Sequence, residues 1–296
     1  MSACPGARCA STRATSRSRQ RAPQRLLALA GLLLAASQPA RAAEPARSGP
    51  PLWELGGMAF GVSQQAYPGS DEHLNRALAL PYFIYRGKLL RADRETVGLR
   101  ALKTERYELD LGVAGSFGGG SDEIKARQGM EKLGTLVELG PRLKVRLGEA
   151  AGGRWRLDLP VRGVFDLNDG ARHRGLSFEP ELLFERQAHA GWRYGMGLSA
   201  IVADRRLGEH FYGVRADQVS PWRSAYAARS GLVAWRLSLS ASHSLSRDWR
   251  LFGFARLDSV SGAANEASPL VRRSSGASVG LGLSYTWMRS EASAHD

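Results

Sequence analysis

Histidines are the side chains in this chain best suited to proton transfer or metal binding, because an imidazole titrates near neutral pH. No two of them have metal-ligand spacing, and the only cysteines are Cys4 and Cys9, so a zinc site is not expected. A Ser-His-Asp triad assembles in space rather than along the sequence, so it stays open. Solvation in turns and loops is the simpler interpretation for most of the set, which is His73, His173, His189, His210, His243 and His295.

Three short patterns offer other chemistry. The Gly-x-Ser-x-Gly match at residues 276–280 opens an alternating segment and has no helix after it, unlike a nucleophile elbow. Residues 118–122 are glycine-rich but lack the Gly-Lys-Ser/Thr of a phosphate loop. The acidic groups at 70–72 and 166–169 do not fit the twelve-residue calcium pattern. The sequence therefore predicts no catalytic residue, no cofactor and no metal site.

Rows of charged side chains are a stronger signal. They lie on the polar face of two neighbouring predicted strands, residues 137–147 and 154–167. Glu179, Glu181 and Glu185 follow nearby and can pair with them across strands. The candidate charges are Glu138, Arg142, Lys144, Arg146, Arg154, Arg156, Asp158 and Arg162.

Strict alternation of apolar and polar residues places these charges on one face of each segment. In residues 137–147 the apolar side chains share one face and the charged ones share the other, whereas a helix would repeat every three or four residues. The same pattern covers residues 107–113, 154–167, 176–184, 233–241 and 279–287. These segments are predicted to be β-strands.

Alternation allows two opposite arrangements, since a soluble sandwich turns its apolar row inward and an outer-membrane barrel turns it toward lipid. We favour the barrel because the strands reach about 10–14 residues, which suits a tilted membrane-spanning strand. The expected fold is all-β, an antiparallel transmembrane β-barrel of the outer-membrane type. The charged rows would then face the interior, either as ion pairs that close it or as a narrow pore that prefers anions. Aromatic residues expected in interfacial girdles are Trp53, Tyr107, Trp155, Trp192, Trp235, Trp249, Tyr285 and Trp287.

The lengths of the connections set the strand count. Short links are expected near residues 149–153, 188–191 and 244–248, and long ones at 118–133, 168–175, 205–230 and 261–274. Short turns of such barrels face the periplasm, which places the carboxy terminus there. Three short strands within residues 81–102, with turns near Gly87 and Arg94, make the count even, at about twelve strands with ten as the alternative.

Prolines interrupt several of these strands, at Pro81, Pro141, Pro160 and Pro180. Each removes a donor from the hydrogen-bond ladder. Bulges or a locally open wall are therefore expected.

Residues 1–42 are typical of a cleaved signal peptide, with six arginines before residue 26, eleven apolar residues at 26–36 and then Ala40-Arg41-Ala42. The leader holds seven of the 41 Lys and Arg and none of the 28 Asp and Glu, which leaves a net charge of +6. Nucleic-acid binding is therefore not expected. The expected mature chain has a short periplasmic lead-in at 43–52, a barrel at 53–287 and a periplasmic tail at 288–296.

Arginines in the predicted loops are expected to face outward, where guanidinium groups can bind lipopolysaccharide phosphates or simply keep the surface soluble. They are Arg172, Arg174, Arg205, Arg206, Arg215, Arg223, Arg272 and Arg273.

Several motifs in the first half of the mature chain occur in a defined order. They are Tyr67-Pro68-Gly69-Ser70-Asp71 after the glycine-rich segment 56–62, then residues 82–85, 97–100, 127–134 and 138–141. In these segments the chain resembles the MipA/OmpV family of outer-membrane proteins. Members usually end near an aromatic residue, whereas a nine-residue tail follows Trp287 here.

The resemblance implies a non-enzymatic protein in the outer membrane of a Gram-negative bacterium. It implies a scaffold that joins a lytic transglycosylase to a penicillin-binding protein during cell-wall growth. Outer-membrane lipid and lipopolysaccharide would surround it, and a periplasmic murein hydrolase or synthase would be its partner. Short periplasmic turns offer little docking surface, so a small channel or stress-responsive porin-like protein is kept as the alternative. The oligomeric state is left open.

Overall fold

A computed structural model describes residues 49–87, 90–92, 97–116 and 124–294 of this chain. The chain divides into two units, residues 1–46 and 47–296, and only the second contains described residues. The predicted signal peptide, its cleavage site and residues 118–122 lie outside the described part.

The described residues form 13 strands and one α-helix. The strands are β1 (Trp53–Gln65), β2 (His73–Arg86), β3 (Leu90–Ala92), β4 (Val97–Lys103), β5 (Tyr107–Ser116), β6 (Leu136–Ala150), β7 (Gly153–Asp166), β8 (Arg172–Phe178), β9 (Glu181–Gln187), β10 (Trp192–Ala203), β11 (Gly231–Ser244), β12 (Trp249–Ser259) and β13 (Ser275–Arg289). The helices are α1 (Arg205–Tyr212) and the 3₁₀ turns η1 (Lys125–Arg127), η2 (Leu167–Asp169), η3 (His189–Gly191) and η4 (Ala216–Gln218). No helix in the described ranges is long and apolar enough to cross a membrane.

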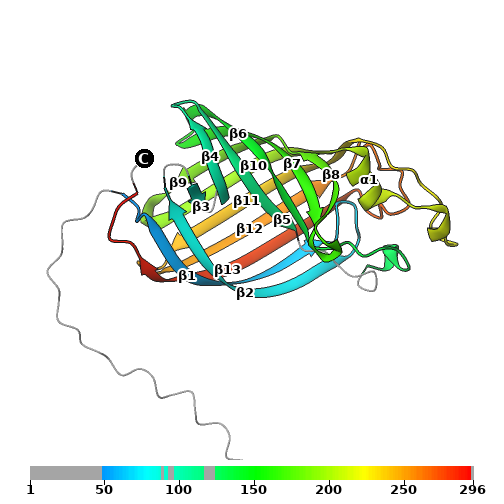
Figure 1. Cartoon of the computed structure of the whole chain (residues 1–296), viewed down its shortest axis with the longest axis horizontal. Coiled ribbons are helices and arrows are strands. Elements are labelled where there is room, and N and C mark those ends of the chain that lie inside the picture. Colours follow the sequence, from blue (N-terminus) through cyan, green and yellow to red (C-terminus); the bar gives the residue numbers. More distant parts are fainter. Residues whose placement is uncertain (1–48, 88–89, 93–96, 117–123, 295–296) are drawn as a thin grey trace, which may run out of the picture. The chain divides into compact units, whose positions relative to one another are not determined.

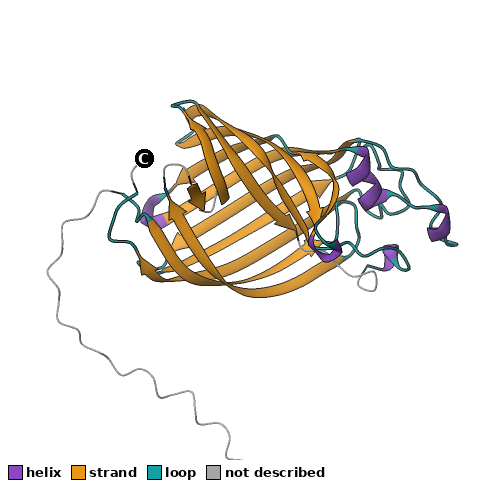
Figure 2. Cartoon of the chain, viewed as in Figure 1, coloured by secondary structure: helices purple, strands orange, loops and turns teal. Residues whose placement is uncertain are grey.

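The strands close into a barrel (Figures 1 and 2). Each pairs antiparallel with its neighbour, and β13 pairs with β1 to complete the circle. β8 and β9 both lie between β7 and β10, so together they occupy one position in the wall. The barrel therefore has 12 strands around its circumference, which confirms the predicted fold class.

The strands of the barrel are shortest where the sequence predicts short strands. β3 has 3 residues and β4 has 7. Among the described residues, β2 pairs with β3 only at Tyr85 and Arg86. Pro81 thus lies where β2 has a ladder partner on the β1 side alone, which agrees with the expectation of a locally open wall. The predicted turn near Arg94 falls outside the described residues.

Pro180 separates β8 from β9, so the segment predicted as one strand at 176–184 is two strands. Proline has no N–H for the ladder, and its carbonyl instead accepts the N–H of Ala200 at 3.2 Å. The long loop predicted at 168–175 is also wrong. The connection is only residues 167–171, because β8 begins at Arg172.

Apolar side chains cover the outer face of the barrel. Leu281 is 64% exposed and Leu198 is 53% exposed. On the opposite face of the same wall, Lys144 and Asp158 are 5% and 4% exposed. This is the reverse of a soluble protein, and it suits a barrel whose outside meets acyl chains.

Aromatic rings gather at one end of the barrel. Trp155 packs on Phe184 with ring centroids 4.9 Å apart, and Trp249 packs on Tyr285 at 4.7 Å. Trp287, on the same rim, is 55% exposed. Rings in this position suit a membrane interface.

The chain's described ends meet at this same rim. The N–H of Leu52 bonds to the carbonyl of Ala292 at 2.8 Å, and the N–H of Ala294 bonds to that of Pro50 at 2.8 Å. The segment after Trp287 is therefore paired: β13 continues to Arg289, and residues 290–294 run along residues 50–53.

Candidate functional site

Asp110 on β5 is the centre of a charge cluster inside the barrel. Arg142 on β6 donates Nε and Nη2 to its two carboxylate oxygens at 3.1 and 3.0 Å. The Nζ of Lys144 lies 3.0 Å from Oδ2. Asp110 is 1% exposed. A carboxylate this deeply buried requires charged partners, because desolvation alone would be very costly.

The same cluster extends onto β7 and β9. Nη1 of Arg142 lies 4.0 Å from Asp158, which accepts a 2.8 Å hydrogen bond from Nε of Arg156. Arg156 also lies 3.7 Å from Glu185. Alternation places these side chains on one face of neighbouring strands, where β6 and β7 pair in register.

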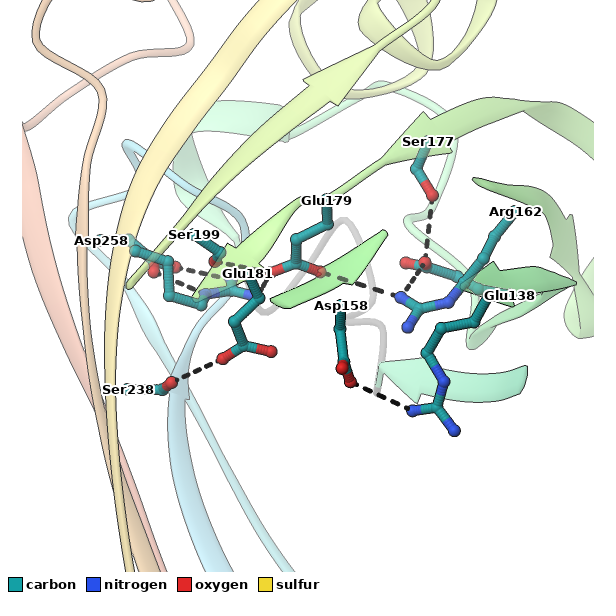
Figure 3. Close-up of polar contacts among 11 residues, drawn as sticks. Glu138, Asp158, Arg162, Ser177, Glu179, Glu181, Ser199, Ser238 and Asp258 are labelled. Carbon is teal, nitrogen blue, oxygen red and sulfur yellow. Dashed lines mark hydrogen bonds and ion pairs between the residues drawn. The ribbon is translucent and has the colours of Figure 1, made fainter. Parts of the chain in front are cut away.

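A second cluster lies nearer the other end of the barrel and runs from β6 to β12 (Figure 3). Arg236 on β11 holds Asp258 in a two-pronged contact at 2.8 and 2.9 Å and reaches Glu179 at 3.3 Å. Arg162 lies 3.8 Å from Glu179 and 3.4 Å from Glu138. Glu179, in the break between β8 and β9, thus joins arginines from two sides.

Small residues on β10 and β11 give these long side chains room. Ser199 donates to Glu179 at 3.1 Å, and Ser238 donates to Glu181 at 2.9 Å (Figure 3). A Cβ added at Gly197 would lie 2.2 Å from Oε1 of Glu181. The carboxylate of Glu181 therefore occupies the space that a side chain at position 197 would fill.

Six of the eight candidate charges lie in these two clusters: Glu138, Arg142, Lys144, Arg156, Asp158 and Arg162. Arg146 is half exposed and 3.9 Å from Glu108 near the aromatic rim, and Arg154 is exposed at the start of β7. Sequence reasoning missed Asp110, Arg236 and Asp258. The signal available in the sequence was that these residues lie on the polar face of segments in which apolar and polar residues alternate.

Two phenylalanines lie on the interior face of β12. Phe252 and Phe254 on β12 lie against β13, where a Cβ on Gly280 would be 2.4 Å from the Phe254 ring. Together with Met58 and Tyr82, they line a cavity of about 720 Å³ in the half of the barrel nearer the aromatic rim. Arg154 and Arg193 line the same cavity from the polar wall.

Loops pack into a cap at the end away from the described termini (Figures 1 and 2). Segments 66–72, 124–135, 204–230 and 260–274 contribute to it. Its hydrophobic core contains Tyr67, Ile124, Leu207, Tyr212 and Leu270, and Ile124 and Leu270 are fully buried. Long loops face outward in outer-membrane barrels, so we expect this end to be the external one.

The residues of the Tyr67-Pro68-Gly69-Ser70-Asp71 motif connect β1 to β2 and anchor this cap. The hydroxyl of Tyr67 donates to the carbonyl of Leu270 at 2.8 Å. Tyr212 donates to the carbonyl of Pro68 at 2.9 Å. Gly69 has φ +90° and accepts the N–H of Arg272 at 2.7 Å. Burial raises the pKa of Tyr67 to about 12, so its hydroxyl stays a donor.

Two arginines are buried in the cap. Arg127 is 3% exposed and donates to the carbonyls of Phe211 and Glu131, and Arg223 is 4% exposed and donates to backbone carbonyls of residues 126, 128 and 218. Within the described residues neither has a carboxylate in ion-pair range. Burial, opposed by Tyr67 but reinforced by the charge of Arg223, lowers the pKa of Arg127 to about 10.

His210 on α1 is partly buried, and its Nε2 atom is enclosed. Burial, followed by the charges of Arg174 and Arg127, lowers its pKa to about 4. The expectation of a solvated loop histidine is wrong here, because α1 turns this side chain into the cap. The expectation that loop arginines face outward is also wrong for Arg174 and Arg223, which are 8% and 4% exposed.

Residues 56–287 match the family model described as MltA-interacting protein MipA. The match runs from β1 to β13. The chain belongs to the MipA family. The predicted family is thereby confirmed, and the match covers the second half of the barrel as well. With its closed sheet, apolar exterior and charged interior, this MipA-family chain is an outer-membrane protein.

Several solved outer-membrane proteins are loosely similar to the MipA-family chain. A bacterial polysaccharide outer-membrane secretin shares 8% identity at a TM-score of 0.39, covering 79% of this chain and 99% of that one. An outer-membrane channel of Pseudomonas putida F1 shares 11% identity at a TM-score of 0.36, covering 83% of this chain and 100% of that one. OmpT of Vibrio cholerae shares 7% identity at a TM-score of 0.33, covering 79% of this chain and 97% of that one. Similarities this loose carry no information about function. No curated protein sequence matches the chain significantly.

Of the three short patterns with other chemistry, the glycine-rich residues 118–122 lie outside the described part of the chain. Residues 276–280 lie within β13, without the strand–turn–helix of a nucleophile elbow. Across residues 49–294, apart from the gaps in description, no three His, Asp or Glu side chains form a group that could hold a metal ion.

Proposed function

We propose that this protein is a non-enzymatic scaffold in the outer membrane for periplasmic murein enzymes. The observation that carries the proposal is that charged side chains inside the barrel bind one another and link its strands. Arg162, Glu179 and Arg236 are bound to one another and to neighbouring strands, and the loops above them pack into a cap with its own core. A barrel built in this way suits assembly better than passage of solutes.

The family description supplies the partner class. MipA is described as an MltA-interacting protein. We infer that this chain likewise binds a lytic transglycosylase of the MltA type, and that a penicillin-binding protein completes the assembly. Both would approach from the periplasm, at the rim where the chain's described ends lie.

That rim is the proposed docking surface. Arg106, Arg154, Arg193 and Arg247 are exposed there, in turns or at the first residues of strands. The paired segments 50–53 and 290–294 add an ordered edge beyond the short turns. A basic and ordered rim fits a partner with an acidic face, and such contacts weaken as salt screens them.

The test is capture of purified MltA-type transglycosylase by the mature barrel in detergent. We expect saturable binding that falls with salt. The double variant Arg106→Glu and Arg247→Glu should lose most of it. The matched control, Arg272→Glu with Arg273→Glu, changes exposed arginines at the capped end and should bind normally. Absence of binding by the wild type, or equal loss in both variants, would contradict the scaffold.

One observation favours a small channel as the second candidate. The cavity of about 720 Å³ joins an aromatic wall to Arg154 and Arg193, and a solute could occupy it. Passage would still require a route past the two charge clusters and the cap. A steady current across a bilayer would therefore support this alternative against the scaffold.

A further inference from the structure

A cleft of about 450 Å³ opens in the cap, and it shares no lining residue with the cavity near the aromatic rim. Its walls come from η1 and the residues after it, the start of β8, helix α1 and the segment leading to η4. Arginines reach it from each of these elements: Arg127, Arg172, Arg174, Arg206 and Arg215.

Arginines outnumber acidic residues among the side chains that line this cleft, where the acids are Glu131 and Glu209. Two of the five arginines are paired with aspartates beside the cleft, Arg172 with Asp169 and Arg215 with Asp217. Arg174 is paired with Asp166 and Glu131, but within the described residues Arg127 and Arg206 have no carboxylate in ion-pair range. In the described part of the chain, the side chain of Arg206 has one hydrogen-bond contact, with Nδ1 of His173 at 3.3 Å. Among the described residues, therefore, neither cation has a carboxylate as a direct counter-charge.

Two buried polar atoms beside the cleft also lack partners. Nε of Arg127 and Nε2 of His210 are enclosed and make no hydrogen bond in the described structure. Buried donors are nearly always satisfied in folded proteins, so each unsatisfied group calls for an explanation. An anion in the cleft would supply the missing acceptor and the missing charge together.

We propose that this cleft binds a phosphate group. A phosphate has several acceptor oxygens and up to two negative charges, which suits guanidinium groups that converge from different elements. Arg127 is a buried residue of the cleft, whereas Arg206 lies on the exposed face of helix α1. Neutral His210 can donate one further hydrogen bond, because its depressed pKa of about 4 leaves the ring uncharged at neutral pH.

Two sources could present a phosphate at the external end of the barrel. One is the phosphorylated headgroup of lipopolysaccharide, and the other is a soluble phosphate ester. The cleft recognises the chemistry that they share. This site is independent of the periplasmic scaffold, so either proposal can fail without the other.

The test compares two neighbouring arginines on α1. Arg206 lines the cleft, whereas Arg205 lies outside it and is 3.9 Å from Glu209. The mature barrel in detergent is titrated with inorganic phosphate by calorimetry. We expect Arg206→Gln to weaken binding about tenfold, the effect of losing one charge-assisted hydrogen bond. Arg205→Gln should bind as the wild type does. Arg127→Gln is avoided as the main probe because Arg127 also fastens the cap.

A second arm separates the sources. Intact and dephosphorylated lipopolysaccharide are added to the same variants. Tighter binding of the intact lipid, lost in Arg206→Gln, assigns the cleft to the lipid headgroup. Inorganic phosphate binding without any preference for the lipid assigns it to a soluble ester. No phosphate binding by the wild type, or equal affinities of wild type and Arg206→Gln for phosphate, would overturn the proposal.

Discussion

Tyr67 and Tyr212 meet edge to face in the cap, with ring centroids 6.2 Å apart and an angle of 80° between the rings. Tyr67 belongs to the turn between β1 and β2, and Tyr212 ends α1, 145 positions later in the numbering. Each hydroxyl bonds to a backbone carbonyl of another loop, at Leu270 and Pro68 respectively. This pair therefore ties three loops together and explains why the motif around Tyr67 holds the cap.

Removing the hydroxyl of Tyr67 tests this tie. Tyr67→Phe keeps the ring but leaves the buried carbonyl of Leu270 without its donor, so the cap should lose about 1–3 kcal/mol. Limited proteolysis should cut residues 260–274 faster than in the wild type. Tyr226→Phe is a suitable control, because its hydroxyl makes only a 3.4 Å contact with Asn265. Equal cleavage of all three proteins would refute the role of Tyr67.

Gly69 is expected to resist substitution for two reasons. Its φ of +90° disfavours any side chain, and a Cβ there would lie 3.2 Å from Cγ1 of Val271. Gly69→Ala should destabilise the cap by at least about 1 kcal/mol. Gly61→Ala on β1 is the matched control, since a Cβ there meets nothing within 4 Å. A cap equally resistant to protease in both variants would show that the turn tolerates a side chain.

Removing one charge of the Arg236–Asp258 pair should cost more stability than replacing both residues by apolar ones. Asp258→Asn leaves a buried guanidinium with Glu179 as its remaining carboxylate, and the cost should be about 3–5 kcal/mol. The double variant Arg236→Met with Asp258→Leu removes both charges and should recover much of that loss. The readout is the temperature at which the folded barrel shifts to its unfolded position on a gel. A double variant as unstable as Asp258→Asn would argue against charge pairing as the cause.

Acid should loosen the cap through His210. Its pKa is about 4 in the folded cap but about 6.5 when unfolded, so the unfolded segment takes up a proton first as the pH falls. Stability is therefore full above pH 6.5 and falls toward pH 4, by at most about 3 kcal/mol. Arg174 and Arg127 disfavour the proton, whereas Asp166 and Glu131 favour it.

Proteolysis of the cap between pH 7.5 and 5 measures this effect. His210→Gln cannot titrate, and its cap should show a flatter profile. Parallel pH profiles for the wild type and the variant would assign the acid sensitivity to other groups.

The barrel could be predicted from sequence because alternation is local. In residues 137–147 every second side chain is apolar, and this fixes both the strand and the face that carries Arg142 and Lys144. The break at Pro180 was harder to place. Leu176 lies in β8 and Phe184 in β9, on opposite sides of Pro180. Because apolar residues alternate with polar ones across the proline, the sequence pattern alone reads as one strand.

The cap could not be predicted in the same way, because its contacts join residues far apart in the chain. Nothing near Tyr67 indicates that Leu270 will accept its hydrogen bond. Helix α1 had one local signal, since Asp204 caps it by accepting the N–H of Leu207 at 2.8 Å. That signal marks where the helix begins, but only packing shows that Nε2 of His210 is enclosed.

The measurement that tests the central claim most directly is conductance of the wild-type protein in a planar bilayer, with an open porin as positive control. If the two charge clusters and the cap commit the interior to structure, the inserted barrel should carry no steady current. Reproducible single-channel steps from the wild type would contradict the account, because they would show an open path past Arg162, Glu179 and Arg236.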